Sequence, residues 1–95
     1  MEVSTKDLRR VTQALLQHLE ETGQTTFEID DDYYWEIPAE KRYQPYEKPT
    51  ELQLGQLSDD WTEVTRMVGG ERKMIAYGLV WLSAVIRRVG EKAVG

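Results

Sequence analysis

The fold is decided by residues 58–89, which read SDDWTEVTRMVGGERKMIAYGLVWLSAVIRRV. A Gly-Gly pair divides this stretch into two helical segments, because glycine inside a helix costs about 1 kcal/mol relative to alanine. The first segment, residues 58–68, begins at Ser58, a residue suited to an N-cap, and its apolar side chains recur at helical spacing. We therefore expect a helix there with one apolar face.

The second segment, residues 72–89, is apolar around most of its circumference and has only a narrow polar arc. This pattern is typical of a central helix that is mostly buried. We expect this helix to form the centre of the core, with Trp81 deeply buried, and to end at Gly90.

Helical spacing also marks the N-terminal part of the chain. Apolar side chains recur on one face of residues 5–21. Ser4 or Thr5 can cap the first turn, and Gly23 can adopt the left-handed conformation that terminates a helix. These signals predict an amphipathic helix over this range.

Between these helices the hydrophobic period changes to two, which is the spacing of a β-strand. Residues 25–29 and 33–37 alternate in this way, and an acidic turn at 30–32 would join them in a hairpin. A weaker alternation at 52–54 allows a third strand. The sequence therefore predicts a single α+β domain over residues 1–95, with three helices packed against a small antiparallel β-hairpin or a three-stranded meander.

Composition narrows the classes of function. The chain has 17 acidic and 12 basic residues, and this net charge of −5 argues against nucleic acid as the ligand, since phosphate binding needs a basic face. Cysteine is absent, which a reducing compartment permits, so a cytoplasmic location is expected. The longest apolar stretch, residues 74–86, would rise only about 20 Å as a helix, against about 30 Å for a bilayer core. We therefore expect no membrane insertion.

The sequence contains none of the common catalytic, phosphate-binding or metal-binding motifs. His18 has no partner at a spacing that acid–base or metal chemistry needs. An EF-hand loop that starts at Asp30 would place Lys41 where the bidentate glutamate belongs. We therefore expect a non-enzymatic protein with no catalytic residue, no cofactor and no metal site.

Aromatic and acidic residues gather between positions 30 and 50. Tyrosine and tryptophan provide large contact areas at low entropic cost in interfaces. In an alternating strand Tyr33 and Trp35 should point into the core and Tyr34 toward solvent. We expect this acidic, tyrosine-rich region to bind another protein, and a basic partner would associate faster. The residues predicted to form the binding surface are Asp31, Asp32, Tyr34, Tyr43, Tyr46 and Glu47.

Three alternatives remain open at this stage. In the first, a small-ligand-binding domain, the same aromatic residues line a pocket and the carboxylates select a cationic ligand. In the second, a carboxylate-based enzyme, two acids converge in a cleft and one has a raised pKa. The enzyme is the least favoured reading. In the third, the chain is a structural or self-associating subunit.

Three strings in this chain are distinctive: DDYYWEIP at residues 31–38, LGQLSDDW at 54–61 and YGLVWLS at 77–83. Together they resemble small uncharacterised bacterial proteins that share a DYYWxIP…LGQLxDDW pattern, over about residues 30–86. The resemblance implies the bacterial cytosol and a recurring fold. It implies no activity, cofactor or site residue.

Overall fold

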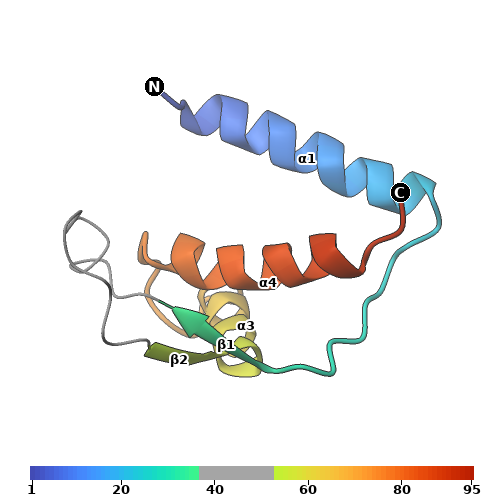
Figure 1. Cartoon of the computed structure of the whole chain (residues 1–95). Coiled ribbons are helices and arrows are strands. Elements are labelled where there is room, and N and C mark those ends of the chain that lie inside the picture. Colours follow the sequence, from blue (N-terminus) through green and yellow to red (C-terminus); the bar gives the residue numbers. More distant parts are fainter. Residues whose placement is uncertain (37–52) are drawn as a thin grey trace, which may run out of the picture.

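The computed structural model describes residues 1–36 and 53–95. Its elements are α1 (Thr5–Glu21), β1 (Tyr33–Glu36), β2 (Gln53–Gln56), α3 (Leu57–Val68) and α4 (Gly78–Lys92). In Figure 1, α4 lies between α1 on one side and the sheet with α3 on the other. The α+β class is therefore confirmed: residues 1–36 and 53–95 form three helices and a two-stranded antiparallel sheet. Among the described residues, no helix combines the length and apolar character that crossing a bilayer requires.

The predicted bounds of α1 are confirmed. The Ser4 hydroxyl oxygen accepts the backbone N–H of Asp7 at 3.0 Å, which is the geometry of an N-cap. After the helix, Gly23 has a φ of 83°, a left-handed conformation that glycine adopts without steric cost.

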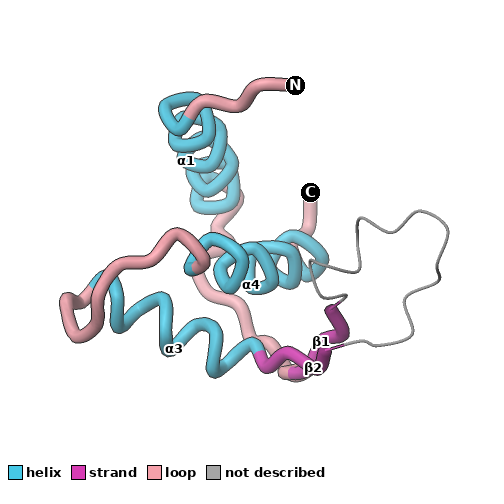
Figure 2. Tube along the Cα trace, turned by 90° about the vertical axis from the view of Figure 1, so that its left-hand side faces the viewer, coloured by secondary structure: helices cyan, strands magenta, loops and turns pink. Residues whose placement is uncertain are grey.

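At its C-terminal end, α1 is joined to residues 94–95 by polar contacts. The side-chain amide of Gln24 exchanges two hydrogen bonds of 2.8 Å with the backbone of Val94, and Nε2 of His18 lies 3.1 Å from the carbonyl oxygen of Gly95. Toward its N-terminal end α1 diverges from α4, as Figures 1 and 2 both show. No residue of α1 is buried.

The predicted strand at 33–37 forms as β1, but its predicted partner is wrong. Residues 25–29 are not a strand, and β1 pairs with β2 instead, with Trp35 opposite Leu54. The physical reason lies at Asp32, whose carbonyl oxygen accepts the N–H of Leu57 at 2.7 Å. That bond continues the alignment of the two strands past Tyr33, so Asp32 cannot also form a tight turn back to residues 25–29.

The hydrophobic core lies mainly between α3 and α4. Three apolar residues in the described part of the chain are buried: Leu57, Met67 and Val85. Gly78, the first residue of α4, is also buried, and a Cβ atom at this position would overlap the terminal methyl group of Met67. The absence of a side chain at Gly78 therefore lets α4 approach α3 closely.

The prediction that α4 is a mostly buried helix over 72–89 is wrong in three respects. The helix starts at Gly78 and runs past Gly90 to Lys92. Trp81 is half-buried, and Leu79 is 68% exposed. The apolar circumference of the segment is therefore only partly covered.

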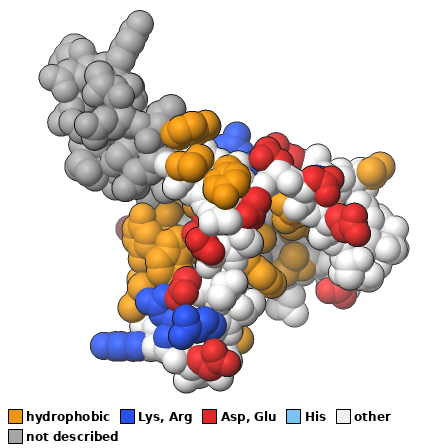
Figure 3. Space-filling model, turned by 90° about the horizontal axis from the view of Figure 1, so that it is seen from below, with side chains coloured by type: hydrophobic (Ala, Val, Ile, Leu, Met, Phe, Trp, Pro, Cys, Tyr) orange, Lys and Arg blue, Asp and Glu red, His pale blue; other side chains and the backbone are white. Residues whose placement is uncertain are grey.

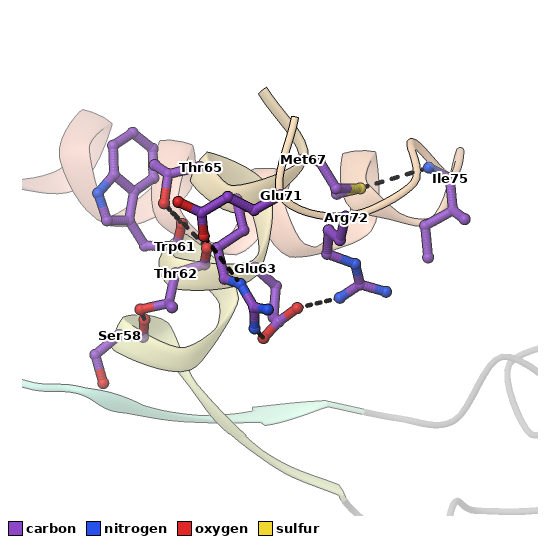
Figure 4. Close-up of polar contacts among 10 residues, drawn as sticks. Ser58, Trp61, Thr62, Glu63, Thr65, Met67, Glu71, Arg72 and Ile75 are labelled. Atoms are coloured by element: carbon purple, nitrogen blue, oxygen red, sulfur yellow. Dashed lines mark hydrogen bonds and ion pairs between the residues drawn. The ribbon is translucent and has the colours of Figure 1, made fainter. Parts of the chain in front are cut away.

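Residues 72–77 were predicted to be helical but form the connection between α3 and α4. Polar contacts hold this connection in place (Figure 4). Arg72 forms an ion pair with Glu63 of α3, and the N–H of Ile75 donates to the sulfur of Met67 at 3.4 Å. Gly70 has a φ of 80°, which turns the chain after α3.

Candidate functional site: the outer face of the sheet and the adjoining pocket

The residues predicted to form a binding surface divide into two groups. Those that the structure describes are Asp31, Asp32 and Tyr34. Those that lie outside the described residues are Tyr43, Tyr46 and Glu47. Each of the three described side chains is bonded to another element of the protein, so each also has a structural role.

Asp32 caps the N-terminus of α3 through tertiary contacts. Its carboxylate accepts the N–H and the hydroxyl of Ser58, both at 2.7 Å, and the side-chain amide of Gln56 at 2.8 Å. The bond from the Ser58 hydroxyl is the main cause that lowers the pKa of Asp32, followed by the bond from Gln56. The predicted N-cap role of Ser58 is wrong, because α3 begins one residue earlier and Asp32 satisfies its free N–H groups.

The other acidic residues of the tract contact the C-terminal part of α4. Asp31 accepts a 2.8 Å hydrogen bond from Arg88, and Asp30 lies 3.7 Å from Lys92. The hydrogen bond to Asp31 raises the pKa of the Arg88 guanidinium. The pair with Arg88 neutralises charge on Asp31 that was predicted to attract a partner, and it links the segment before β1 to α4.

Replacing Asp32 with alanine is expected to lower the melting temperature by about 5 °C, a typical effect of losing an N-cap in a small domain. Asp30→Ala is the matched control and should melt like wild type, because the Asp30 side chain is 89% exposed. Folding lowers the pKa of Asp32. The contribution of the Asp32 carboxylate to the stability of the fold is therefore complete above the unfolded pKa, about 3.9. It is lost as the pH falls through the folded pKa. Thermal melts from neutral pH down to about pH 2 check this; an Asp32→Ala deficit that stays constant would contradict it.

Tyr34 is partly exposed, as predicted, but it lies on the inner face of the sheet, so the predicted orientation of the two faces of β1 is wrong. Its ring packs over Gly55, the residue opposite it in β2, and its hydroxyl donates a hydrogen bond to Asp60 of α3. Burial raises the pKa of Asp60, and the hydrogen bond from Tyr34 partly offsets that rise. Tyr34 therefore joins the sheet to the first turn of α3.

The outer face of the sheet carries two exposed aromatic side chains and an exposed leucine. Directly opposed residues of an antiparallel pair share a face, so Trp35 and Leu54 lie together, with Tyr33 two residues along β1. Their exposed fractions are 67% for Trp35, 57% for Leu54 and 53% for Tyr33. The prediction that Tyr33 and Trp35 point into the core is wrong. Figure 3, which views the side of the sheet and α3, shows hydrophobic side chains next to acidic ones, and a group of Lys and Arg side chains in the lower part of the view.

A pocket of about 450 Å³ lies between the sheet, the start of α3 and the start of α4. The aromatic and acidic residues that line it are Tyr33, Tyr34, Tyr77, Trp81, Asp59 and Asp60. Trp81 meets Tyr77 edge to face, with ring centroids 5.6 Å apart, and the Arg72 guanidinium lies 5.4 Å from the Trp81 ring. Aromatic rings beside carboxylates form an environment that favours a cation.

Sequence reasoning did not place α3 and α4 residues in this site. Trp81 was predicted to be a core residue, and no motif in the sequence marks Asp59 or Asp60 as part of a site. Tyr77 and Trp81 are one helical turn apart, which is visible in the sequence, but their proximity to Asp60 depends on the pairing of β1 with β2.

Within residues 1–36 and 53–95, no group of three or more histidine, cysteine or acidic side chains is arranged to hold a metal ion. A comparison of the chain with protein-family models, curated protein sequences and solved structures finds no match. The resemblance to small bacterial proteins therefore stays a prediction.

Proposed function

We propose that this chain is a non-enzymatic protein-interaction module that binds its partner through the outer face of the sheet. The observation that carries this proposal is the exposure of Tyr33, Trp35 and Leu54 on one face of a sheet whose other face packs on α3. Exposed aromatic side chains held on a rigid frame are typical of interface centres, because little entropy is lost when they are covered. Compared with the surface predicted from sequence, the proposed surface keeps the region of β1 but uses the opposite face.

The adjoining pocket supports a partner that presents a lysine or arginine side chain. Asp59 and Asp60 provide negative charge at the pocket, and Tyr77 and Trp81 provide aromatic rings. A cationic side chain inserted there gains both Coulombic attraction and contact with the rings. The net charge of −5 adds long-range attraction for a basic partner.

Trp35→Ala is expected to weaken capture of the partner roughly thirty-fold, the effect of losing a hot-spot residue worth about 2 kcal/mol. Its melting temperature should stay close to that of wild type, since the side chain is mostly exposed. Trp61→Ala is the control, because Trp61 is also exposed, at 50%, but lies on α3 outside the pocket. The measurement is quantitative mass spectrometry of proteins captured from native lysate by the three forms, followed by binding kinetics at low and high salt.

The salt dependence of the association rate tests separately whether the partner is basic. Association with a basic protein should slow as ionic strength rises, whereas association through apolar contacts alone should not. A partner captured equally by wild type and Trp35→Ala would place the interface elsewhere and contradict the proposal.

A small cationic ligand is the second candidate, and the pocket itself favours it. The pocket is within the usual size range of ligand sites and has aromatic and acidic walls. A thermal-shift screen against amines distinguishes the two: a melting temperature raised by an amine, together with no captured protein, would replace the interaction module with a ligand-binding domain.

A further inference from the structure

The apolar face of α1 is uncovered from Leu8 to Leu16. The exposed fractions of its main apolar side chains lie between about half and two thirds: Leu8 51%, Val11 51%, Leu15 63% and Leu16 49%. An isolated amphipathic helix of this length is marginal in water, and it gains its stability from packing of the apolar face. The polar contacts at Gln24 and His18 hold only one end of α1.

A groove of about 670 Å³ continues this uncovered face onto α4. Its apolar lining comes from α1, with Leu8 and Leu16, and from α4, with Leu79, Leu82 and Ile86. A groove of this size has room for several apolar side chains of another molecule. The groove and the α1 face therefore form one continuous apolar surface without a partner among the described residues.

The charges on α1 are arranged to complement a second, antiparallel α1. On a helical projection, Arg9 and Glu20 lie on one edge of the apolar face, and Asp7 and His18 lie on the other. Neither Arg9 nor Glu20 forms an ion pair with any residue that the structure describes. In an antiparallel pair, each edge of one helix lies against the same edge of the other helix, which runs in the opposite direction. Arg9 therefore lies near the second copy's Glu20, and Glu20 lies near the second copy's Arg9. A parallel pair would instead place unlike edges together, with Arg9 near the second copy's Asp7.

The apolar side chains of α1 also face one another in an antiparallel pair. If the two helices cross near residues 13–14, Leu8 lies beside the second copy's Leu19, and Val11 lies beside its Leu16. Apolar side chains and charges are thus both matched in one antiparallel arrangement, which a twofold axis can generate.

We propose that two copies of this chain associate through α1, with the helices antiparallel about a twofold axis and the second copy's α1 seated over the groove between α1 and α4. This interface uses a different surface from the outer face of the sheet, so it does not rest on the proposed function.

The test measures the mass of the full chain by sedimentation equilibrium over a wide range of concentration. Wild type is expected to be a dimer. Leu15→Glu should raise the dissociation constant at least about ten-fold by placing a charge in the apolar interface, whereas Ala14→Glu, next to it on the polar side of α1, should leave the dimer intact. Circular dichroism of both variants establishes that α1 still forms.

A charge swap tests the antiparallel geometry even if Leu15→Glu fails to fold. Arg9→Glu and Glu20→Arg should each weaken the dimer, and the double variant should restore it, because the opposite charges meet again only in the antiparallel pair. A wild-type chain that is monomeric throughout, or a double variant that is no tighter than the single ones, would overturn the proposal.

Discussion

Met67→Ala is expected to lower the free energy of unfolding by about 2–5 kcal/mol, the range observed when a buried methionine is truncated. Met67 is 5% exposed and is one of three buried apolar residues in the described part of the chain. Its terminal methyl group fills the space beside Gly78, and its sulfur accepts the N–H of Ile75. The substitution therefore opens a cavity between α3 and α4 and leaves a backbone donor without its acceptor. Because a small domain has only about 5–10 kcal/mol of net stability, a large share would be lost.

Met74→Ala is the matched control for this prediction. Met74 lies in the connection before α4 and is 67% exposed, so its truncation should change the free energy of unfolding by less than about 0.5 kcal/mol. Urea unfolding of the two variants and wild type, followed by tryptophan fluorescence, gives the comparison. Equal midpoints for the two methionine variants would show that α3 and α4 do not form the main core.

Local signals in the sequence were sufficient for α1 and for most of α3. The bounds of α1 follow from a capping serine, helical spacing and a glycine beyond the last turn, all of which act within a few residues. The start of α4 depends instead on contacts with α3, namely the ion pair of Arg72 with Glu63 and the bond from Ile75 to Met67. Spacing within residues 72–89 does not contain that information.

The pairing of β1 and the orientation of its side chains could not be predicted from alternation alone. Tyr33, Tyr34 and Trp35 are all large and aromatic, so the sequence does not mark which face is apolar. The face is decided by Gly55, which leaves room for the Tyr34 ring, and by Asp60, which accepts its hydroxyl. Both residues lie on segments distant in sequence.

The surface predicted from sequence and the proposed surface share the region of β1 but use different residues. The acidic tract before β1 was predicted to form a hairpin turn, yet Asp31 pairs with Arg88 and Asp32 caps α3. A short tract of carboxylates has the same composition whether it caps a distant helix or faces solvent, so only tertiary structure separates the two roles.

Gly55→Ala is expected to lower the free energy of unfolding by about 1–3 kcal/mol, as overpacking does at a tight contact. A Cβ atom at Gly55 would overlap the ring of Tyr34, which is rigid and cannot move aside without releasing Asp60. The hydrogen bond from Tyr34 lowers the pKa of Asp60, so its loss should raise that pKa further. A raised folded pKa penalises the ionised carboxylate, so the deficit of the variant should grow as the pH rises from below about 4 toward neutrality.

Gly90→Ala is the control that separates this contact from the general effect of adding a methyl group to glycine. Gly90 lies within α4, and a Cβ atom there would have no neighbour within 4 Å. Alanine at an open helical position should raise the free energy of unfolding, by up to about 1 kcal/mol, because glycine loses more backbone entropy on folding. Chemical unfolding of both variants at neutral and acidic pH measures the difference in sign. If Gly55→Ala were as stable as Gly90→Ala at neutral pH, the Tyr34 ring would not pack on Gly55, and the assignment of Trp35 to the outer face of the sheet would fail with it.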